Sequence, residues 1–341
     1  MPGKILVTGA SGFIASHCIL DLLQHGYEVR GTVRDRNRAK QVRDVLVEHH
    51  EGAAEMEFAI TDLTSTSGWT DAIEGCDGVF HIASPVPTIQ PKDASEVIEP
   101  ARQGTLNVLS AAQTVGIKRV VLTSSVAAVM GSKKISEQIY TSDDWSDPED
   151  PDLTPYAASK TIAEKVAWDF VDQNLKQGTS LTELATINPG LVLGPALEAD
   201  YGSSLEVLYK LLTGGIPLVP RIGFEIVDVR DVAALHRLAF EHPEAAGKRF
   251  LCGAGFRWFI EVAQLLHKEF PDYKKIPLRL MPNVLAKVFA IFIKELGSII
   301  NDLDTVKKMD CAPALDIGWR PRSPEEAIID GGKSLVDLGV L

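Results

Sequence analysis

The chain has 341 residues, of which 45% are hydrophobic, and a net charge of -12 at pH 7. This length allows two structural lobes with a real core, and the acidic balance argues against nucleic acid or an anionic membrane as partner. The four cysteines lack metal-ligand spacing, and the chain start lacks the pattern of a signal peptide. We therefore expect a cytoplasmic protein with reduced thiols and no metal site. The apolar stretch 284–300 contains charged residues and predicts a core helix, not a membrane span.

A strand, a glycine turn and a helix start lie within the first fifteen residues. Gly9 and Gly12 let the backbone approach a ligand closely because they carry no Cβ, and Ala15 lets the following helix pack tightly on the strand. A phosphate placed there would meet free N–H groups and the positive end of the helix dipole. The run therefore predicts a dinucleotide site made by Gly9, Ser11, Gly12, Phe13 and Ile14.

Strands and helices alternate through the first half of the chain. Short runs rich in Val and Ile predict strands at 4–8, 27–33, 56–60, 78–82 and 118–124, with helices at 12–25, 36–49, 66–75 and 94–115. A helix over 156–176 and a strand over 181–187 continue the pattern. This alternation requires parallel strands with helical crossovers, hence an α/β protein with a Rossmann-type doubly wound sheet.

The regular alternation of strands and helices ends after residue 188, where short strands near 225–228 and 248–252 are predicted among helices. We expect 1–188 to form the Rossmann domain, to which 225–250 returns, and 189–341 to form mainly the smaller substrate-binding lobe. The acidic, proline-bearing stretch 142–152 predicts a surface loop. The protein is expected to be a monomer or a homodimer, since two crossover helices could pair or stay solvated.

The end of the second predicted strand selects between NAD and NADP. A carboxylate there usually binds the adenosine ribose of NAD, but this chain carries Arg34, and Arg38 follows one helical turn later. A guanidinium can grip a phosphate through two donors, so the pair favours NADP(H) over NAD(H). The alternative is a solvated basic patch, with Asp35 reaching a ribose. Asp62 and Leu63, which end the third strand, would flank the adenine.

Tyr156 and Lys160 stand four residues apart at the start of a predicted helix, so both project from one face. A carbonyl that accepts a hydride needs a proton on its oxygen, and a tyrosine can supply it if its pKa falls from about 10 towards neutrality. The lysine cation, together with the positive charge of the oxidised nicotinamide, would lower that pKa. Ser125 ends the fifth strand, at the sheet edge where such folds bind ligands, and would orient the carbonyl. The three side chains predict carbonyl reduction by Ser125, Tyr156 and Lys160.

In this order the motifs resemble the extended short-chain dehydrogenase/reductases. Within them the chain is similar to the group that holds dihydroflavonol reductases, cinnamoyl-CoA reductases and yeast methylglyoxal (aldehyde) reductases. Supporting segments beyond the site residues above lie at 32–34, 81–85, 104–109, 188–195, 227–232 and 318–321. The resemblance covers nearly the whole chain, and the ordered set is more specific than any one segment.

The resemblance implies further contacts with the cofactor. Ala83 and Ser84 would contact its ribose and pyrophosphate, Pro189 to Val192 would contact the nicotinamide carboxamide, and Ser204 would contact a phosphate. Tyr156 and Lys160 would also touch the cofactor, because Lys160 would bond the nicotinamide ribose. Asn107 would hold a water of a proton relay, unless it is a packing residue in its helix.

Two departures from the family argue against the plant substrates. Residues 154–157 lack the Asn-Trp-Tyr-Cys signature of cinnamoyl-CoA reductases, and Met130 replaces an asparagine of dihydroflavonol reductases. Residues 84–87, Met130 and a helix over 205–212 predict a mostly apolar pocket. We therefore expect an NADPH-dependent oxidoreductase that reduces a medium-sized ketone or aldehyde. The alternatives are a sugar-nucleotide epimerase or dehydratase, a hydroxysteroid dehydrogenase/isomerase, and a non-catalytic NADP-binding redox sensor.

Overall fold

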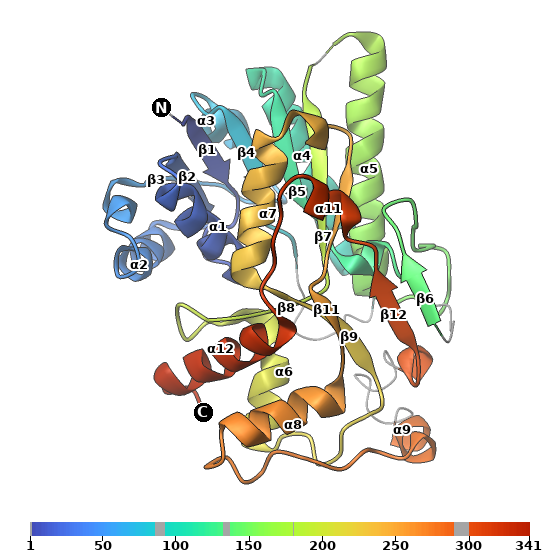
Figure 1. Ribbon diagram of the computed structural model, residues 1–341. Coiled ribbons are helices and arrows are strands. Elements are labelled where there is room, and N and C mark those ends of the chain that lie inside the picture. Colours follow the sequence, from blue (N-terminus) through green and yellow to red (C-terminus); the bar gives the residue numbers. More distant parts are fainter. Residues whose placement is uncertain (1, 86–92, 132–136, 180, 290–299) are drawn as a thin grey trace.

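The computed structural model describes residues 2–85, 93–131, 137–179, 181–289 and 300–341. A seven-stranded sheet forms its larger part (Figure 1). The strands, in spatial order, are β10 (Arg249–Cys252), β7 (Glu183–Pro189), β5 (Arg119–Thr123), β4 (Gly78–His81), β1 (Lys4–Val7), β2 (Glu28–Val33) and β3 (Glu57–Ile60). Every neighbouring pair is parallel, and the strand order reverses at β1, where doubly wound sheets bind ligands. The predicted Rossmann-type class is confirmed.

Helices cover both faces of this sheet. On one face α1 (Phe13–Gln24) packs against α7 (Val229–Glu241), and on the other α4 (Ser95–Val115) packs against α5 (Pro155–Gln177) and α3 (Trp69–Ile73). The apolar run of β1 serves both layers: Ile5 and Val7 join the core beneath α1, whereas Leu6 joins the core beneath α4. Successive side chains of a strand point to opposite faces, so a strand buried on both sides reads as a continuous apolar run.

Two helices near β2 and β3 follow the predicted pattern with one difference. The helix α2 (Arg36–Val47) begins and ends close to its predicted bounds, but α3 is much shorter than the predicted helix at 66–75. Gly68 has a φ of +85°, a left-handed conformation in which a helix cannot continue, and α3 begins directly after it.

A smaller part of the molecule has its own core (Figure 1). A three-stranded sheet of β8 (Leu191–Leu193), β9 (Gly223–Asp228) and β11 (Gly255–Trp258) lies beside α6 (Gly202–Thr213), α8 (Phe259–Glu269) and α12 (Pro324–Asp337). Leucine side chains of α6 fill this core together with Phe259 and Ile328. Arg230 links the two parts, because its Nη2 atom lies 2.6 Å from carboxylates of both Asp228 and Asp330.

One sheet was not predicted from the sequence. The strands β6 (Glu137–Tyr140) and β12 (Val306–Met309) pair in parallel although they are far apart in the chain. The helix α9 (Asn283–Phe289) lies at the start of the stretch 284–300 that was predicted to be a helix, and residues 290–299 lie outside the described residues. The remaining short elements are α11 (Ala312–Asp316) and the 3-10 turns η1 (Glu51–Glu55), η2 (Val126–Ala128), η3 (Pro243–Ala245) and η4 (Ile300–Asp302).

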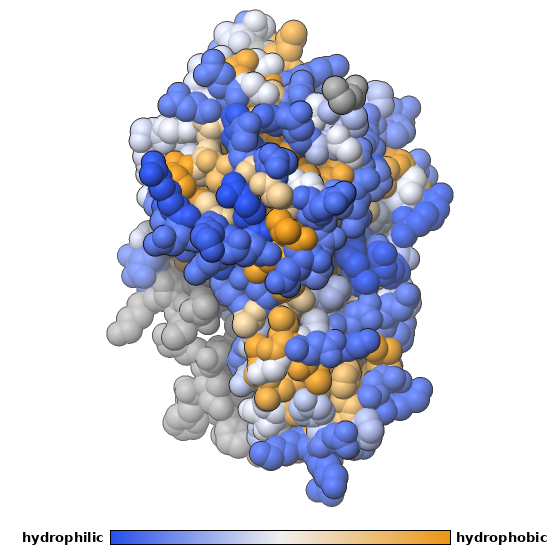
Figure 2. Space-filling view, turned by 90° about the vertical axis from the view of Figure 1, so that its left-hand side faces the viewer, coloured by the Kyte–Doolittle hydropathy of each residue, from blue (hydrophilic) through white to orange (hydrophobic). Residues whose placement is uncertain are grey.

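The surface also differs between the two parts. Figure 2 shows hydrophilic side chains over most of the upper half of one face, whereas apolar side chains gather in the lower half. Within the described ranges, no helix is long and apolar enough to cross a membrane.

Candidate active site

The turn between β1 and α1 brings the backbone close to a neighbouring strand end. Gly9 has a φ of +67°, and a Cβ on it would lie 2.9 Å from the Cβ atom of Ala83. After Gly12 the helix α1 begins without a side-chain cap, and its first turn contains no acidic residue. No acidic residue of this first turn therefore neutralises its N–H groups or the positive end of the dipole. These features fit the pyrophosphate of a dinucleotide.

Thr8 places the segment after β4 beside this turn. Its Oγ1 atom accepts hydrogen bonds at 2.9 Å from two backbone N–H groups, one of which belongs to Ala83. Ala83 and Ser84 are half-buried and follow β4 at the sheet edge. Their contact with the cofactor stays a prediction from the resemblance.

Arg34 and Asp62 stand near each other where β2 and β3 end. Hydrogen bonds from Thr64 lower the pKa of the Asp62 carboxyl, and the charge of Arg34 adds to this effect. The Arg34 side chain is exposed. A cation and an oriented carboxylate therefore face the edge at which the adenosine end of a dinucleotide is predicted.

Asp35 and Arg38 are both engaged within the protein. The Asp35 carboxylate caps α2 and accepts a hydrogen bond at 2.9 Å from the backbone N–H of Arg38. The alternative in which Asp35 reaches a ribose would cost this cap. The Arg38 guanidinium is paired with Glu198, with Nη2 at 2.7 Å from Oε1.

Leu63 and Asn107 form one structural unit. Leu63 packs close to α4, where a Cβ on Gly104 would lie 3.0 Å from the Leu63 Cβ atom. The Asn107 amide nitrogen donates to the backbone oxygens of Leu63 at 2.9 Å and Ser65 at 3.0 Å. Both amide hydrogens of Asn107 are therefore used to hold the loop after β3. This finding supports the packing alternative over a role in a water relay.

Ser125, Tyr156 and Lys160 come together beyond the end of β5. Ser125 caps η2, and its oxygen accepts a hydrogen bond at 3.1 Å from the N–H of Ala127. Its hydroxyl also lies near the phenol of Tyr156, in the first turn of α5, and favours the ionised form of that phenol. Lys160 lies one turn further, with Nζ at 5.9 Å from the centre of the Tyr156 ring.

Burial controls the protonation of this site. Loss of hydration raises the pKa of Tyr156, and the nearby Ser125 hydroxyl opposes that rise. Burial also lowers the pKa of Lys160 to about 8, against the charge of Glu164, which favours the ammonium form. In the protein alone, desolvation outweighs the favourable contacts of the phenol. The fall in the tyrosine pKa stays a prediction for the protein with bound nicotinamide.

Glu164, one turn beyond Lys160, is a buried carboxylate that the sequence analysis did not identify. It accepts hydrogen bonds from five side chains: Ser124 (2.5 Å), Asn188 (2.7 Å), Arg249 (2.7 Å), Thr186 (3.0 Å) and Trp168 (3.3 Å). The four-residue spacing between Lys160 and Glu164 was a usable signal, because it places both on one helix face.

A cavity of about 240 Å³ lies beside Tyr156. Its apolar lining includes Met130, Leu191, Ile222 and Phe224, and its charged lining includes Glu225, Asp302 and Lys307. Met130 was expected here. The leucines of α6 were not correctly predicted as pocket residues, because they fill the core of the smaller part.

The other predicted contacts lie close to this cavity or to the glycine turn. Pro189 ends β7, and Val192 buries its side chain in the core, while its neighbours Gly190 and Leu191 line the cavity. Ser204 is half-buried in the first turn of α6. That turn approaches α1, since a Cβ on Gly202 would lie 3.5 Å from the Phe13 Cβ atom.

A glycine turn for a dinucleotide, beside a Ser–Tyr–Lys set at the edge of a parallel sheet, is the arrangement of a nicotinamide-dependent oxidoreductase. Residues 5–253 match the family described as "NAD dependent epimerase/dehydratase family". The chain belongs to this family, the extended short-chain dehydrogenase/reductases.

Similarity to named proteins supports this family membership. Cinnamoyl-CoA reductase 1 of Petunia hybrida is 39% identical over 275 residues, which cover 79% of this chain and 78% of the relative. Tetraketide alpha-pyrone reductase 1 of Arabidopsis thaliana is 35% identical over 357 residues, covering 99% and 97%. The crystal structure of yeast methylglyoxal/isovaleraldehyde reductase Gre2 complexed with NADPH superposes with a TM-score of 0.81 at 26% identity, covering 99% of this chain and 100% of that one. The predicted resemblance is confirmed.

Proposed function

We propose that the protein is an NADPH-dependent carbonyl reductase that converts a ketone or an aldehyde to an alcohol. One observation carries the proposal: the Tyr156 phenol, which interacts with the Ser125 hydroxyl, lines a cavity of about 240 Å³. A proton donor and a second hydrogen-bond donor therefore meet at a space that a small molecule can enter. The relatives named above are reductases, and one of them was crystallised with NADPH.

NADPH, when bound, supplies the hydride that reduces the carbonyl carbon. Tyr156 donates its phenolic proton to the carbonyl oxygen as that oxygen gains negative charge. Ser125 donates a hydrogen bond to the same oxygen, and the Lys160 ammonium stabilises the phenolate that remains. One hydride and one proton complete the alcohol, and Tyr156 regains its proton from solvent. The raised pKa of Tyr156 keeps its proton in place at neutral pH, which suits the direction of reduction.

The preference for NADP(H) rests on the end of β2. Arg34 is exposed there and could bind a 2′-phosphate, whereas the Asp35 carboxylate caps the N-terminus of α2. The glycine turn would hold the pyrophosphate through its backbone. The further proposed cofactor contacts are Ser11, Phe13, Ile14, Arg38, Asp62, Leu63, Ala83, Ser84, Pro189, Val192 and Ser204.

The cavity indicates the substrate class. A closed cavity of about 150 Å³ accommodates benzene, so a volume of about 240 Å³ suits a substituted aryl or branched aliphatic carbonyl compound. Met130, Leu191 and Phe224 would contact its apolar body. Lys307 is held by Gly131 O at 2.9 Å and Asp302 at 2.6 Å, so its charge is already compensated. An anionic substrate is therefore disfavoured, since the lining also contains Glu225 and Asp152.

Replacement of Tyr156 by Phe tests the proposal. Loss of the proton donor should lower kcat at least about 100-fold, with the Kd for NADPH changed by less than about twofold. Tyr27→Phe is the matched control, because Tyr27 bonds Glu241 at 3.0 Å on the surface and should be dispensable for turnover. Turnover above about a tenth of wild type in Tyr156→Phe would refute the role of the phenol.

The alternative functions considered from the sequence would give different experimental results. A purified protein that retains NAD and interconverts a sugar nucleotide without net oxidation would be an epimerase. A protein that binds NADPH but oxidises it with none of a panel of aliphatic aldehydes, diketones and aryl ketones would fit the non-catalytic sensor. The proposal predicts NADPH oxidation with at least one class of that panel.

A further inference from the structure

Glu198 forms an ion pair with the guanidinium of Arg38. Arg38 Nη2 donates to Glu198 Oε1 at 2.7 Å, and Nη1 donates to Oε2 at 3.1 Å. Asp200 adds a more distant oxygen at 3.5 Å from Nη2. The side chains of Arg38 and Glu198 are only 22% and 24% exposed, whereas Asp200 is 77% exposed. The pairing with Glu198 is therefore the stronger one, because solvent screens it less.

The other terminal donors of Arg38 are also in use. Nη1 donates to Gln41 Oε1 at 3.3 Å, and Nη2 donates to the backbone oxygen of Ser11 at 3.4 Å. A phosphate could reach this fork only by displacing one of the partners. Glu198 is the partner that a phosphate would replace, because both are anions that accept two parallel N–H bonds from arginine.

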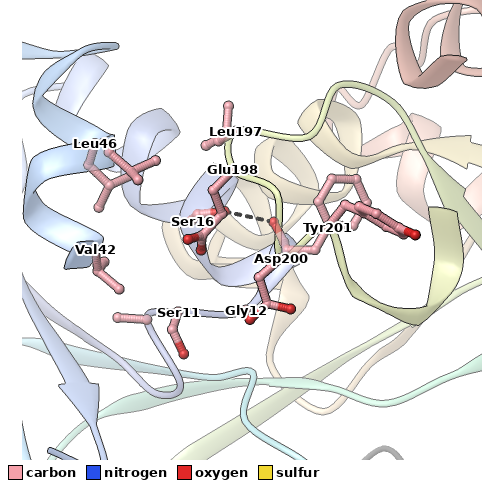
Figure 3. Close-up of a pocket in the computed structure, with 12 residues that line it drawn as sticks. Ser11, Gly12, Ser16, Val42, Leu46, Leu197, Glu198, Asp200 and Tyr201 are labelled. Atoms are coloured by element: carbon pink, nitrogen blue, oxygen red, sulfur yellow. Dashed lines mark hydrogen bonds between the residues drawn. The ribbon is translucent and has the colours of Figure 1, made fainter. Parts of the chain in front are cut away.

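The position of Glu198 matches the predicted cofactor site. Leu197, Glu198 and Tyr201 line one side of a small cavity, and Ser11 and Gly12 line the other (Figure 3). The segment between β8 and α6 thus faces the glycine turn, and one of its carboxylates reaches the first turn of α2. A dinucleotide bound at the glycine turn would extend its adenosine end towards this pair.

Arg34 behaves differently from Arg38. Its side chain is exposed, and it makes no hydrogen bond or ion pair with another residue within the described ranges, although its charge acts on Asp62. One of the two predicted phosphate ligands is therefore available. The other is neutralised by an internal carboxylate.

We propose that Glu198 is a specificity-determining residue that competes with the 2′-phosphate of NADP for Arg38, an inference that rests on the proposed function. Its negative charge lowers the affinity for NADPH and leaves the affinity for NADH almost unchanged, because NADH carries a hydroxyl group at that position. Glu198 therefore makes the preference for NADPH over NADH smaller than it would be if both Arg34 and Arg38 were free to bind the 2′-phosphate.

Isothermal titration calorimetry on Glu198→Gln tests the competition, with NADPH, NADH and the redox-inert probe 2′,5′-ADP as ligands. We expect this variant to bind NADPH and 2′,5′-ADP about fivefold more tightly, with NADH within about twofold of wild type. The gain should shrink as the salt concentration rises. Asp44→Asn is the matched control: it removes the same charge from α2, where Asp44 pairs with Lys40 at 2.9 Å, and should change each affinity by less than about twofold.

Unchanged or weaker binding of 2′,5′-ADP to Glu198→Gln would overturn the inference. Arg38→Gln separates this failure from failure of the proposed function. If Arg38→Gln weakens 2′,5′-ADP binding while Glu198→Gln has no effect, only the competition is wrong. If wild type binds NADH as tightly as NADPH and neither Arg34→Gln nor Arg38→Gln changes that ratio, the proposed use of NADP fails together with the inference.

Discussion

Glu164 and Arg249 form an ion pair inside the protein, with Arg249 Nε at 2.7 Å from Glu164 Oε1 and the two side chains 0% and 8% exposed. Arg249 also donates to the backbone oxygens of Ser142 and Asp144, and its guanidinium lies 3.7 Å from the centre of the Trp145 ring. The pair joins α5, which carries Tyr156 and Lys160, to the edge strand β10 and to the acidic loop. The position of α5, and with it of Tyr156 and Lys160, therefore depends on a buried charge pair.

Replacement of Arg249 by Met should destabilise the protein strongly. The Glu164 carboxylate would remain buried without its cation, and breaking such a pair costs about 3–5 kcal/mol of unfolding free energy. Chemical denaturation of wild type and variant measures this difference.

Arg257→Met supplies the control for that measurement. Arg257 pairs with Glu325 at 2.6 Å, but the two side chains are 32% and 43% exposed. Solvent-exposed pairs contribute about 0–1 kcal/mol, so this variant should lose little stability. Equal losses in the two variants would show that the Glu164–Arg249 pair is no stronger than a surface contact.

Lys160 makes stability depend on pH in the alkaline range. Its pKa is about 8 in the folded protein against 10.5 for an unperturbed lysine. Below about pH 8 both folded and unfolded chains carry the charge, and the folded state bears the whole penalty of burying it. Between about pH 8 and 10.5 the unfolded chain binds more protons, so the unfolding free energy rises with pH, by up to about 3 kcal/mol from this group.

Comparison with Lys160→Met isolates this effect from other titrating groups. The variant lacks the buried charge, so its stability advantage over wild type should be largest at pH 7 and should shrink towards pH 10. Urea denaturation at several pH values gives the difference. A difference that stays constant over this range would contradict the lowered pKa of Lys160.

Local patterns made much of the fold predictable. The apolar run of β1, the glycine turn after it and the spacing of Tyr156 and Lys160 are contained within a few residues, so each could be interpreted without the rest of the chain. The strands of the large sheet were found for the same reason, because a strand buried on both faces is almost wholly apolar.

Features that depend on distant partners could not be predicted in this way. Arg38 and Glu198 are 160 residues apart, and nothing near either one indicates the pairing. The charged wall of the cavity includes Lys307, which belongs to the unpredicted strand β12. Burial raises the pKa of Tyr156 in the protein alone, and a four-residue spacing does not report burial.

Replacement of Gly9 by Ala should damage cofactor binding more than folding. The positive φ of Gly9 costs about 1–3 kcal/mol for a residue with a Cβ, and that Cβ would also press on Ala83 at 2.9 Å. Gly75→Ala is a matched control, since Gly75 has a φ of +77° but nothing within 4 Å of the added Cβ. Both variants should lose stability, but only Gly9→Ala should weaken NADPH binding, by about tenfold or more. Similar NADPH affinities in the two variants would argue against the glycine turn as the nucleotide site.

Replacement of Asn107 by Ala tests whether this residue has a structural or a catalytic role. Its amide holds the loop that carries Asp62 and Leu63, and it accepts a hydrogen bond from Gln103 at 2.8 Å. Asn107→Ala removes the side-chain donor to the backbone oxygen of Leu63, whereas the oxygen of Ser65 keeps the indole N–H of Trp69 at 3.0 Å. The loss should cost about 1 kcal/mol of stability and should weaken NADPH binding, because the loop flanks the proposed adenine site. Since the side chain donates to that loop and not to the site of Tyr156, kcat at saturating NADPH should stay within about threefold of wild type. A variant with normal stability and NADPH affinity but a kcat reduced about 100-fold would instead place Asn107 in a proton relay, and the structural interpretation of its hydrogen bonds would be wrong.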